Sequence, residues 1–162
     1  ALSTENAEIR YLLFYKIIEA KSTDIVRKDF EKEVAECLNN NPNDIESVHK
    51  AARNMNRNSR DNELAKVVMR HFMKNLISQL ESLPEFLNKD NQYKGTNEID
   101  KQRLNKLADK IGSALYATRN SIAHAKANYE KKKNECPKEQ LEQLNVFMKE
   151  TCRIIIESNE YV

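Results

Sequence analysis

The sequence predicts an all-α domain, because turn residues are scarce and apolar residues recur at helical spacing. Only 2 glycines and 3 prolines occur among 162 residues, whereas a sheet-rich fold needs many such residues to reverse its strands. Every strong apolar pattern has a period near 3.6 residues. We expect one domain over residues 1–162, an up-and-down bundle of four long helices plus one shorter helix. The chain begins with Ala1, so we expect either a processed protein or a piece of a longer one.

The N-terminal half predicts two helices and a less regular segment. An apolar stripe after a polar start predicts a helix over residues 4–21. A second helix is expected to begin at Thr23 or Asp24, whose side chains can cap it, and to end in the Asn-rich run before Pro42. Residues 43–62 carry only a thin apolar stripe, which indicates a weak helix or an ordered loop.

The rest of the chain predicts three further segments of helix. Residues 64–83 form the clearest amphipathic pattern, which stops at a proline, and residues 84–97 have the composition of a loop. Apolar positions from 99 to 122 predict a long helix that closes at the polar run 131–134. Pro137 suits the first turn of a last helix.

Composition narrows the functional classes. The formal net charge is only +2, so binding to nucleic acid would depend on where the charges lie. Three unpaired cysteines without metal-like spacing indicate reduced thiols, and no apolar run approaches the ~20 residues of a membrane span. We expect a cytoplasmic protein with no membrane segment. No zinc, calcium or phosphate-loop motif is present, so the sequence predicts no metal and no cofactor.

One short stretch of the long helix carries the main functional signal. It reads Arg119-Asn120-Ser121-Ile122-Ala123-His124, and a final amphipathic helix follows it. Here the chain resembles the HEPN superfamily of helical bundles, whose signature is an arginine, four to six residues and a histidine. Asn is common after that arginine, and the run from Leu12 to Glu19 looks like the first helix of several bacterial members. The Apea-like and abortive-infection-type members are the most similar.

The resemblance implies metal-independent RNA cleavage in many members and a non-catalytic binding role in others. The toxin subgroup with a tyrosine two residues after the histidine is disfavoured, because Lys126 occupies that position. As a partner the resemblance implies RNA, in the setting of phage defence or another bacterial stress response.

The chemistry of the motif suits RNA cleavage. Imidazole ordinarily titrates near pH ~6.5, so a histidine can remove a proton from the 2′-hydroxyl that attacks the adjacent phosphate, and His124 is the candidate. The guanidinium of Arg119 can stabilise the negative charge of the transition state, and Asn120 can orient the phosphate or the imidazole.

Helical geometry separates the two principal side chains. Five residues place Arg119 and His124 about 140° apart on a regular helix, so the helix is distorted, or Arg119 reaches around it, or a second copy completes the site. Ser113, Ala117, Asn120 and His124 lie opposite the core positions of this helix. We interpret this small, polar face as a homodimer contact, with an ordinary solvated face as the alternative.

Two basic groups are candidate contacts for an RNA backbone. Lys50, Arg53, Arg57 and Arg60 are spaced to share one side of a helix, and Lys126, Lys131, Lys132 and Lys133 follow the motif. A solvated helix face is the alternative for each group. His71 is expected in the core or at its boundary, and His49 on the surface.

Two other functions remain open beside a HEPN-like ribonuclease or RNA-binding domain. The chain could be a non-catalytic interaction or dimerisation domain of the same fold, in which Arg119 and Asn120 only fix helix ends. Alternatively it is a helical adaptor whose motif is accidental.

Overall fold

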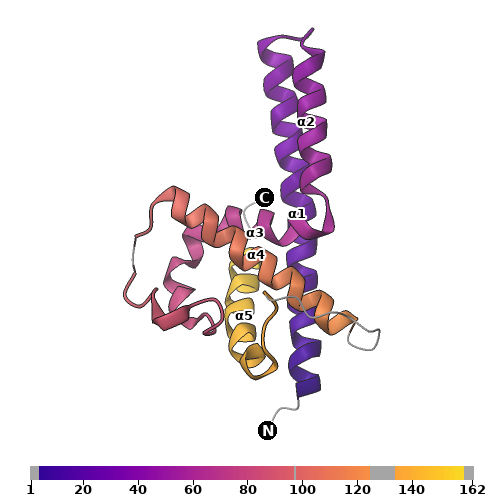
Figure 1. Cartoon of the computed structure of the whole chain (residues 1–162). Coiled ribbons are helices and arrows are strands. Elements are labelled where there is room, and N and C mark those ends of the chain that lie inside the picture. The colour runs from indigo at the N-terminus through magenta and orange to yellow at the C-terminus, as the bar shows by residue number, and fades with distance from the viewer. Residues whose placement is uncertain (1–3, 97, 125–133, 159–162) are drawn as a thin grey trace.

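The computed structural model confirms the all-α prediction. It describes residues 4–96, 98–124 and 134–158, which form five α-helices and no strand (Figure 1). The helices are α1 (Thr4–Asn40), α2 (Ile45–Asn58), α3 (Asp61–Leu76), α4 (Lys101–Ala123) and α5 (Leu141–Ser158). Three 3₁₀ segments, Ile77–Ser82, Lys89–Asn91 and Lys138–Gln140, connect them.

The first helix corrects the prediction of two helices with a break near Thr23. α1 runs without interruption through this point for 37 residues. The hydroxyls of Ser22 and Thr23 donate to the carbonyl oxygen of Glu19 at 2.6 and 3.2 Å, so they bond back into the helix instead of capping a new one. The expected end before Pro42 is confirmed, since α1 stops at Asn40.

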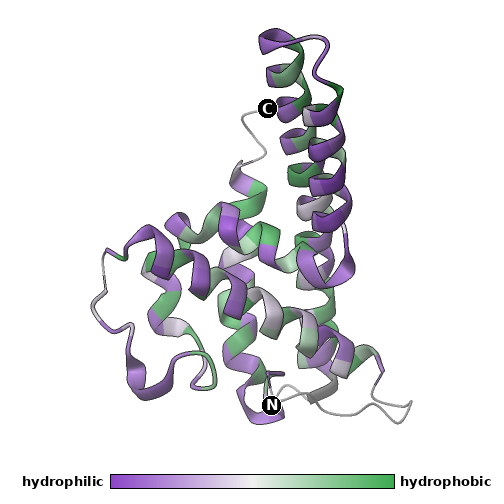
Figure 2. Ribbon diagram, turned by 45° about the horizontal axis from the view of Figure 1, so that its top comes forward, coloured by the Kyte–Doolittle hydropathy of each residue, from purple (hydrophilic) through white to green (hydrophobic). Residues whose placement is uncertain are grey.

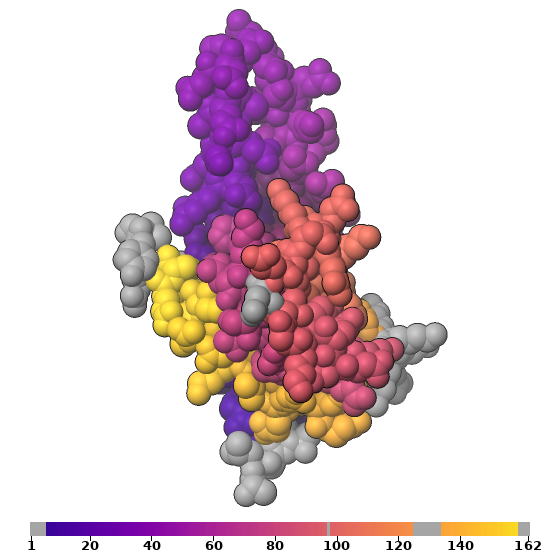
Figure 3. Space-filling model, turned by 90° about the vertical axis from the view of Figure 1, so that its left-hand side faces the viewer, coloured from indigo at the N-terminus to yellow at the C-terminus, as the bar shows by residue number. Residues whose placement is uncertain are grey.

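Residues 43–62, interpreted as a weak helix or an ordered loop, contain the helix α2. Asp44 caps α2 by accepting a hydrogen bond from the backbone N–H of Ser47 at 3.0 Å. α2 returns along the C-terminal part of α1, and the two form an arm that projects from the body (Figures 1 and 3). Ala51 is the buried residue of α2.

The helix expected over residues 64–83 changes its geometry near its end. α3 stops at Leu76, and a 3₁₀ segment continues it to Ser82, just before the predicted stop at Pro84. The following loop is confirmed, with one short 3₁₀ turn inside it. Leu87 and Tyr93 of this loop are buried, so it contributes to the core.

α3 and α4 pack antiparallel and very closely. A Cβ atom on Gly112 would lie 2.6 Å from the Cα of Lys66, so only glycine permits this approach. Farther along the pair, Arg70 Nε is 2.6 Å from a carboxylate oxygen of Asp109. These contacts fix the position of α4, which carries the motif.

α5 lies beside the N-terminal half of α1 and runs parallel to it. The side-chain amide of Asn145 donates to the carbonyl oxygen of Ala7 at 2.9 Å, and the thiol of Cys152 lies 3.5 Å from that of Phe14. Pro137 precedes a 3₁₀ turn, and the α-helix begins at Leu141, later than predicted.

The core lies where α3, α4 and α5 meet the N-terminal half of α1. The expected stripe of α4 is buried there at Leu104, Leu107, Ile111 and Leu115, whereas Ile122 is only partly buried. Apolar and polar residues alternate along the helices, as Figure 2 shows. No helix among the described residues is long and apolar enough to cross a membrane.

Candidate functional site

The motif occupies the C-terminal end of α4. Arg119 and Asn120 belong to its last turns, and His124 is the residue that ends it, with its backbone N–H donating to the carbonyl oxygen of Asn120 at 2.9 Å. The helix therefore closes at Ala123, earlier than the run 131–134 where the sequence predicts its end. His124 is exposed, and Arg119 and Asn120 are half-buried.

Arg119 already has partners within the chain. Its Nη1 donates to Oδ1 of the neighbouring Asn120 at 3.0 Å. Its Nη2 lies 4.0 Å from Oε1 of Glu19 on α1, and the two side chains are 36% and 37% exposed. A pair this long and this exposed contributes little stability, on the order of 0–1 kcal/mol, so an incoming phosphate can displace it.

The separation expected between Arg119 and His124 follows from the helix that carries them. A regular helix rises about 7.5 Å over five residues, and their directions differ by about 140°. The backbone of His124 is no longer helical, with φ −110° and ψ 14°. It is thus the residue in this stretch whose backbone departs from the helix.

Polar contacts near the motif end of α4 join it to α1 and to the segment before α5. The hydroxyl of Tyr11 donates to the carbonyl oxygen of Leu115 at 2.6 Å, and that of Thr118 donates to the carbonyl oxygen of Ala114 at 2.7 Å. The backbone N–H of Cys136 donates to Thr118 Oγ1 at 2.9 Å and so ties the segment before α5 to the same place. Sequence reasoning missed Tyr11, because residue spacing does not show which partner a tyrosine hydroxyl reaches.

The surroundings of Arg119 also contain negative charge. Burial raises the pKa of Tyr15 well above its usual value, and nearby Glu19 raises it further, whereas Arg119 lowers it. Tyr116 and Asp61 add smaller contributions that raise it. Tyr15 is therefore neutral at physiological pH, and the negative charge beside Arg119 comes from Glu19.

Three residues of the first basic group lie on α2, and the fourth lies beyond its end. Lys50, Arg53 and Arg57 lie on one side of α2 and are exposed. The prediction that Arg60 shares that side is wrong, because α2 ends at Asn58 and Arg60 precedes the first residue of α3. A shallow pocket of about 450 Å³ has Lys50 on one wall and Glu33 and Glu36 of α1 on another, so acidic residues partly offset this basic side.

The second basic group lies outside the described residues. Lys126, Lys131, Lys132 and Lys133 all fall in the stretch 125–133, which is not described.

The small-residue face of α4 is only partly open. Ala117 is 3% exposed within the single chain, so the expectation that it lies on a free face is wrong. Ser113 and Asn120 remain half-buried, and His124 is exposed. The part of this face left open to a second copy consists of Ser113, Tyr116 and Asn120, which are half-buried, and we call it the exposed ridge of α4.

The other two histidines and two of the cysteines lie on other helices than the motif, whereas Cys136 contacts Thr118 beside it. His49 is exposed as predicted. The expectation that His71 lies in the core or at its boundary is wrong, because His71 is exposed and its ring packs edge to face on Phe72 at 4.8 Å between ring centroids. Burial raises the pKa of the Cys136 and Cys152 thiols to about 12. Within the described part of the chain, no group of three or more His, Cys, Asp or Glu residues could hold a metal ion.

No protein-family model, no curated protein and no solved structure matches this chain. Function is therefore inferred from the residues and from their geometry.

Proposed function

We propose that this chain is a HEPN-like domain that binds RNA and cleaves it without a metal ion. The observation that carries the proposal is the exposure of His124 at the end of the helix that also holds Arg119 and its bonded neighbour Asn120. An exposed general base at the end of a helix is accessible to an RNA chain, whereas a small enclosed pocket would exclude such a polymer. Its setting, by resemblance to the superfamily, would be a bacterial defence or stress system.

The proposed reaction is an attack by the RNA on its own backbone. Neutral His124 accepts the proton of a 2′-hydroxyl, and the 2′-oxygen forms a bond to the adjacent phosphorus. The bond from phosphorus to the 5′-oxygen breaks, and that oxygen takes a proton from solvent. The products are a 2′,3′-cyclic phosphate and a 5′-hydroxyl.

Arg119 would stabilise the charge that develops on the phosphate oxygens. Its planar guanidinium presents five donors, of which Asn120 engages Nη1. The bond to Asn120 limits the rotation of Arg119, so the arginine is partly oriented before RNA binds. Glu19 is its competitor, because a phosphate and this carboxylate would occupy the same side of the guanidinium.

The proposed assembly is a homodimer through the exposed ridge of α4. Arg119 and His124 diverge around the helix axis, so one copy does not easily direct both at one phosphate. A twofold contact between two α4 ridges would bring four such side chains together.

The test is cleavage of a single-stranded RNA by the purified chain in the presence of a chelator. We expect a 2′,3′-cyclic phosphate end and no reaction with DNA of the same sequence, which lacks the 2′-hydroxyl. A requirement for added divalent metal, or equal cleavage of DNA, would exclude this mechanism.

A non-catalytic interaction domain is the second candidate. The observation that favours it is that Arg119 pairs with Glu19 of α1, so that the arginine also joins two helices. In that case Arg119 and Asn120 fix the end of α4, and the exposed ridge binds another protein or a second copy. This alternative predicts a folded dimer or complex that leaves RNA intact.

A further inference from the structure

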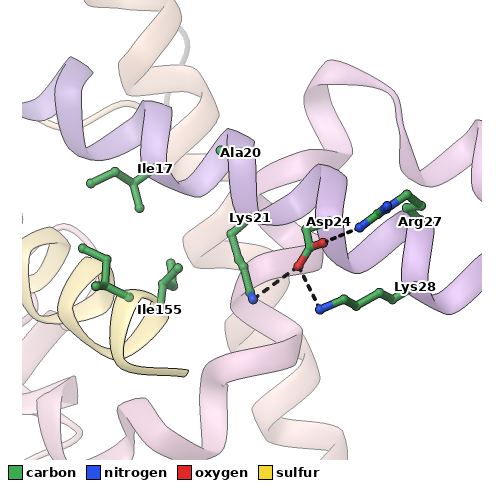
Figure 4. A pocket seen from close by; sticks show the side chains of 8 residues that line it. Ile17, Ala20, Lys21, Asp24, Arg27, Lys28 and Ile155 are labelled. Carbon is green, nitrogen blue, oxygen red and sulfur yellow. Dashed lines mark hydrogen bonds and ion pairs between the residues drawn. The ribbon is translucent and has the colours of Figure 1, made fainter. Parts of the chain in front are cut away.

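A mixed polar and apolar cavity lies between α1 and the end of α5, away from the motif (Figure 4). Its volume is about 500 Å³. This is within the range of small-molecule sites, roughly 300–1,000 Å³. Glu19, which faces Arg119, is two residues before Lys21 of the cavity, so the two side chains point about 160° apart around α1. The cavity and the motif are therefore on opposite sides of this helix.

One wall of the cavity presents three cations around a single carboxylate. Asp24 lies 3.0 Å from Arg27 Nη2, 3.2 Å from Lys28 Nζ and 3.5 Å from Lys21 Nζ. Figure 4 shows these contacts as dashed lines from the carboxylate of Asp24 to the three basic side chains. The hydrogen bond from Arg27 is the largest influence that lowers the pKa of Asp24, with Lys28 next, so the acid stays ionised. Three positive charges and one negative charge leave a local excess of positive charge.

The three cations differ in how freely they can meet a ligand. The Lys21 side chain is only 9% exposed, and its ammonium lies 6.0 Å from the ring centroid of Phe72. The side chains of Arg27 and Lys28 are 63% and 45% exposed. An arginine has five donors and a lysine three, so both retain donors beyond the contact with Asp24. Lys21 thus supplies a fixed charge, and Arg27 and Lys28 supply adjustable donors.

The opposite wall is apolar. Ile17 of α1 and Ile155 and Ile156 of α5 line it. Ile155 is buried in the core, whereas Ile156 is 53% exposed. An inorganic anion would leave this wall in contact with water, whereas an organic anion with an apolar body would cover it.

We propose that this cavity binds a small organic phosphate, with the phosphate on Arg27, Lys28 and Lys21 and its apolar part on Ile155 and Ile156. Arginine and lysine together favour a phosphate, since the guanidinium offers a planar pair of donors and the ammonium a point charge. The proposal does not depend on the RNA function, because none of its residues belongs to the motif.

The test compares phenyl phosphate with inorganic phosphate on the whole chain. Binding is measured by calorimetry and by the methyl signals of labelled isoleucines. We expect phenyl phosphate to bind at least tenfold tighter than inorganic phosphate, with saturable shifts of the Ile155 and Ile156 methyl signals. Equal affinity of the two probes, or shifts confined to other isoleucines, would overturn the proposal.

Charge variants complete the test. Arg27→Gln combined with Lys28→Gln should weaken phenyl phosphate binding at least tenfold while the melting temperature stays close to that of the parent. The matched control is Lys16→Gln combined with Lys32→Gln, which removes two charges from exposed positions of the same helix outside the cavity. An unchanged affinity in the double variant, or an equal loss in the control, contradicts the assignment. Ile156→Ser provides a separate check, since it should reduce the advantage of phenyl phosphate over inorganic phosphate.

Discussion

The guanidinium of Arg119 lies 4.0 Å from the carboxylate of Glu19, so the cation proposed to meet RNA is already paired across α4 and α1. Both side chains are about one-third exposed, which allows solvent to screen the pair. This arrangement suits a site whose arginine changes partners when a phosphate arrives.

The first prediction concerns this competition. Glu19→Gln should raise the affinity for single-stranded RNA severalfold, because the variant removes a negative charge that competes with phosphate for Arg119. The matched control is Glu31→Gln, an exposed position on the arm portion of α1. Filter binding at fixed salt measures the effect. Equal gains in both variants would indicate a change of net charge rather than release of Arg119.

The second prediction concerns the basic side of α2. Replacing Lys50, Arg53 and Arg57 together by glutamine should reduce the slope of log affinity against log salt by about 2, since each lost contact with a single-stranded phosphate contributes ~0.7. Changing Lys74, Lys110 and Lys149, which are also exposed, gives a control with the same loss of charge. If the control variant loses the same slope, α2 is an ordinary solvated face.

The third prediction concerns the dimer. Ser113→Glu should convert a dimer to monomers, because Ser113 lies about 200° from the core position Ile111 and a twofold contact would bring two new carboxylates together. Light scattering at micromolar concentration measures the mass. Ala117 cannot serve in this test, because it is buried and a charge there would unfold the chain. A monomeric parent would refute the dimer directly.

The fourth prediction concerns the contact between Tyr11 and α4. Tyr11→Phe should destabilise the fold by about 1–2 kcal/mol at neutral pH, because it leaves the buried carbonyl oxygen of Leu115 without this donor. Chemical denaturation measures the loss.

Alkaline pH gives a second measurement on the same residue. Burial raises the pKa of Tyr11 well above its usual value, so the folded state retains a proton that the unfolded chain loses near pH ~10. This contribution to stability is complete below pH ~10 and is lost as pH rises toward the folded pKa. Tyr11→Phe should therefore lose less stability than the parent above pH ~10. Parallel pH curves for the two proteins would contradict the burial of this hydroxyl.

The sequence predicts the fold class well but not the break points of the helices. The spacing of apolar residues in α3, α4 and α5 indicates helices. Pro42 and Pro84 lie just beyond helical segments, because proline lacks a backbone N–H and clashes with the preceding turn. Thr23 and Asp24 look like a helix start, yet the Thr23 hydroxyl bonds back to Glu19, and Asp24 is engaged by three cations of its own helix. Such a choice between a cap and an internal bond depends on packing that sequence spacing does not contain.

The sequence alone identifies the residues of the motif, but it does not predict which residues pack against them. Spacing singles out Arg119 and His124, whereas the partner of Arg119 is 100 positions away on α1. Helical periodicity places Ala117 opposite the core positions of α4. It does not show how many neighbouring helices pack against α4, so it could not predict that Ala117 is buried. α4 is contacted by both α3 and α1, and this leaves a narrower ridge than the periodicity predicts.

The last prediction separates an enzyme from a scaffold. Arg119→Ala and His124→Ala should each abolish RNA cleavage while the melting temperature stays within a few degrees of the parent. Both side chains lie at the surface, and the ion pair of Arg119 is long and exposed, so little stability is lost with either. Asn120→Ala should reduce cleavage less, because it only loosens the arginine.

The competing interaction domain makes the opposite prediction for the same variants. If Arg119 serves chiefly to hold α4 on α1, Arg119→Ala should lower the melting temperature by several degrees, and Glu19→Ala should produce a comparable fall. The double variant would then lose no more than either single variant, because the pair is already broken. Thermal unfolding and cleavage assays on the same preparations distinguish the two outcomes. Stable variants that have lost the cleavage seen in the parent support the ribonuclease, and destabilised variants of a parent that leaves RNA intact support the scaffold.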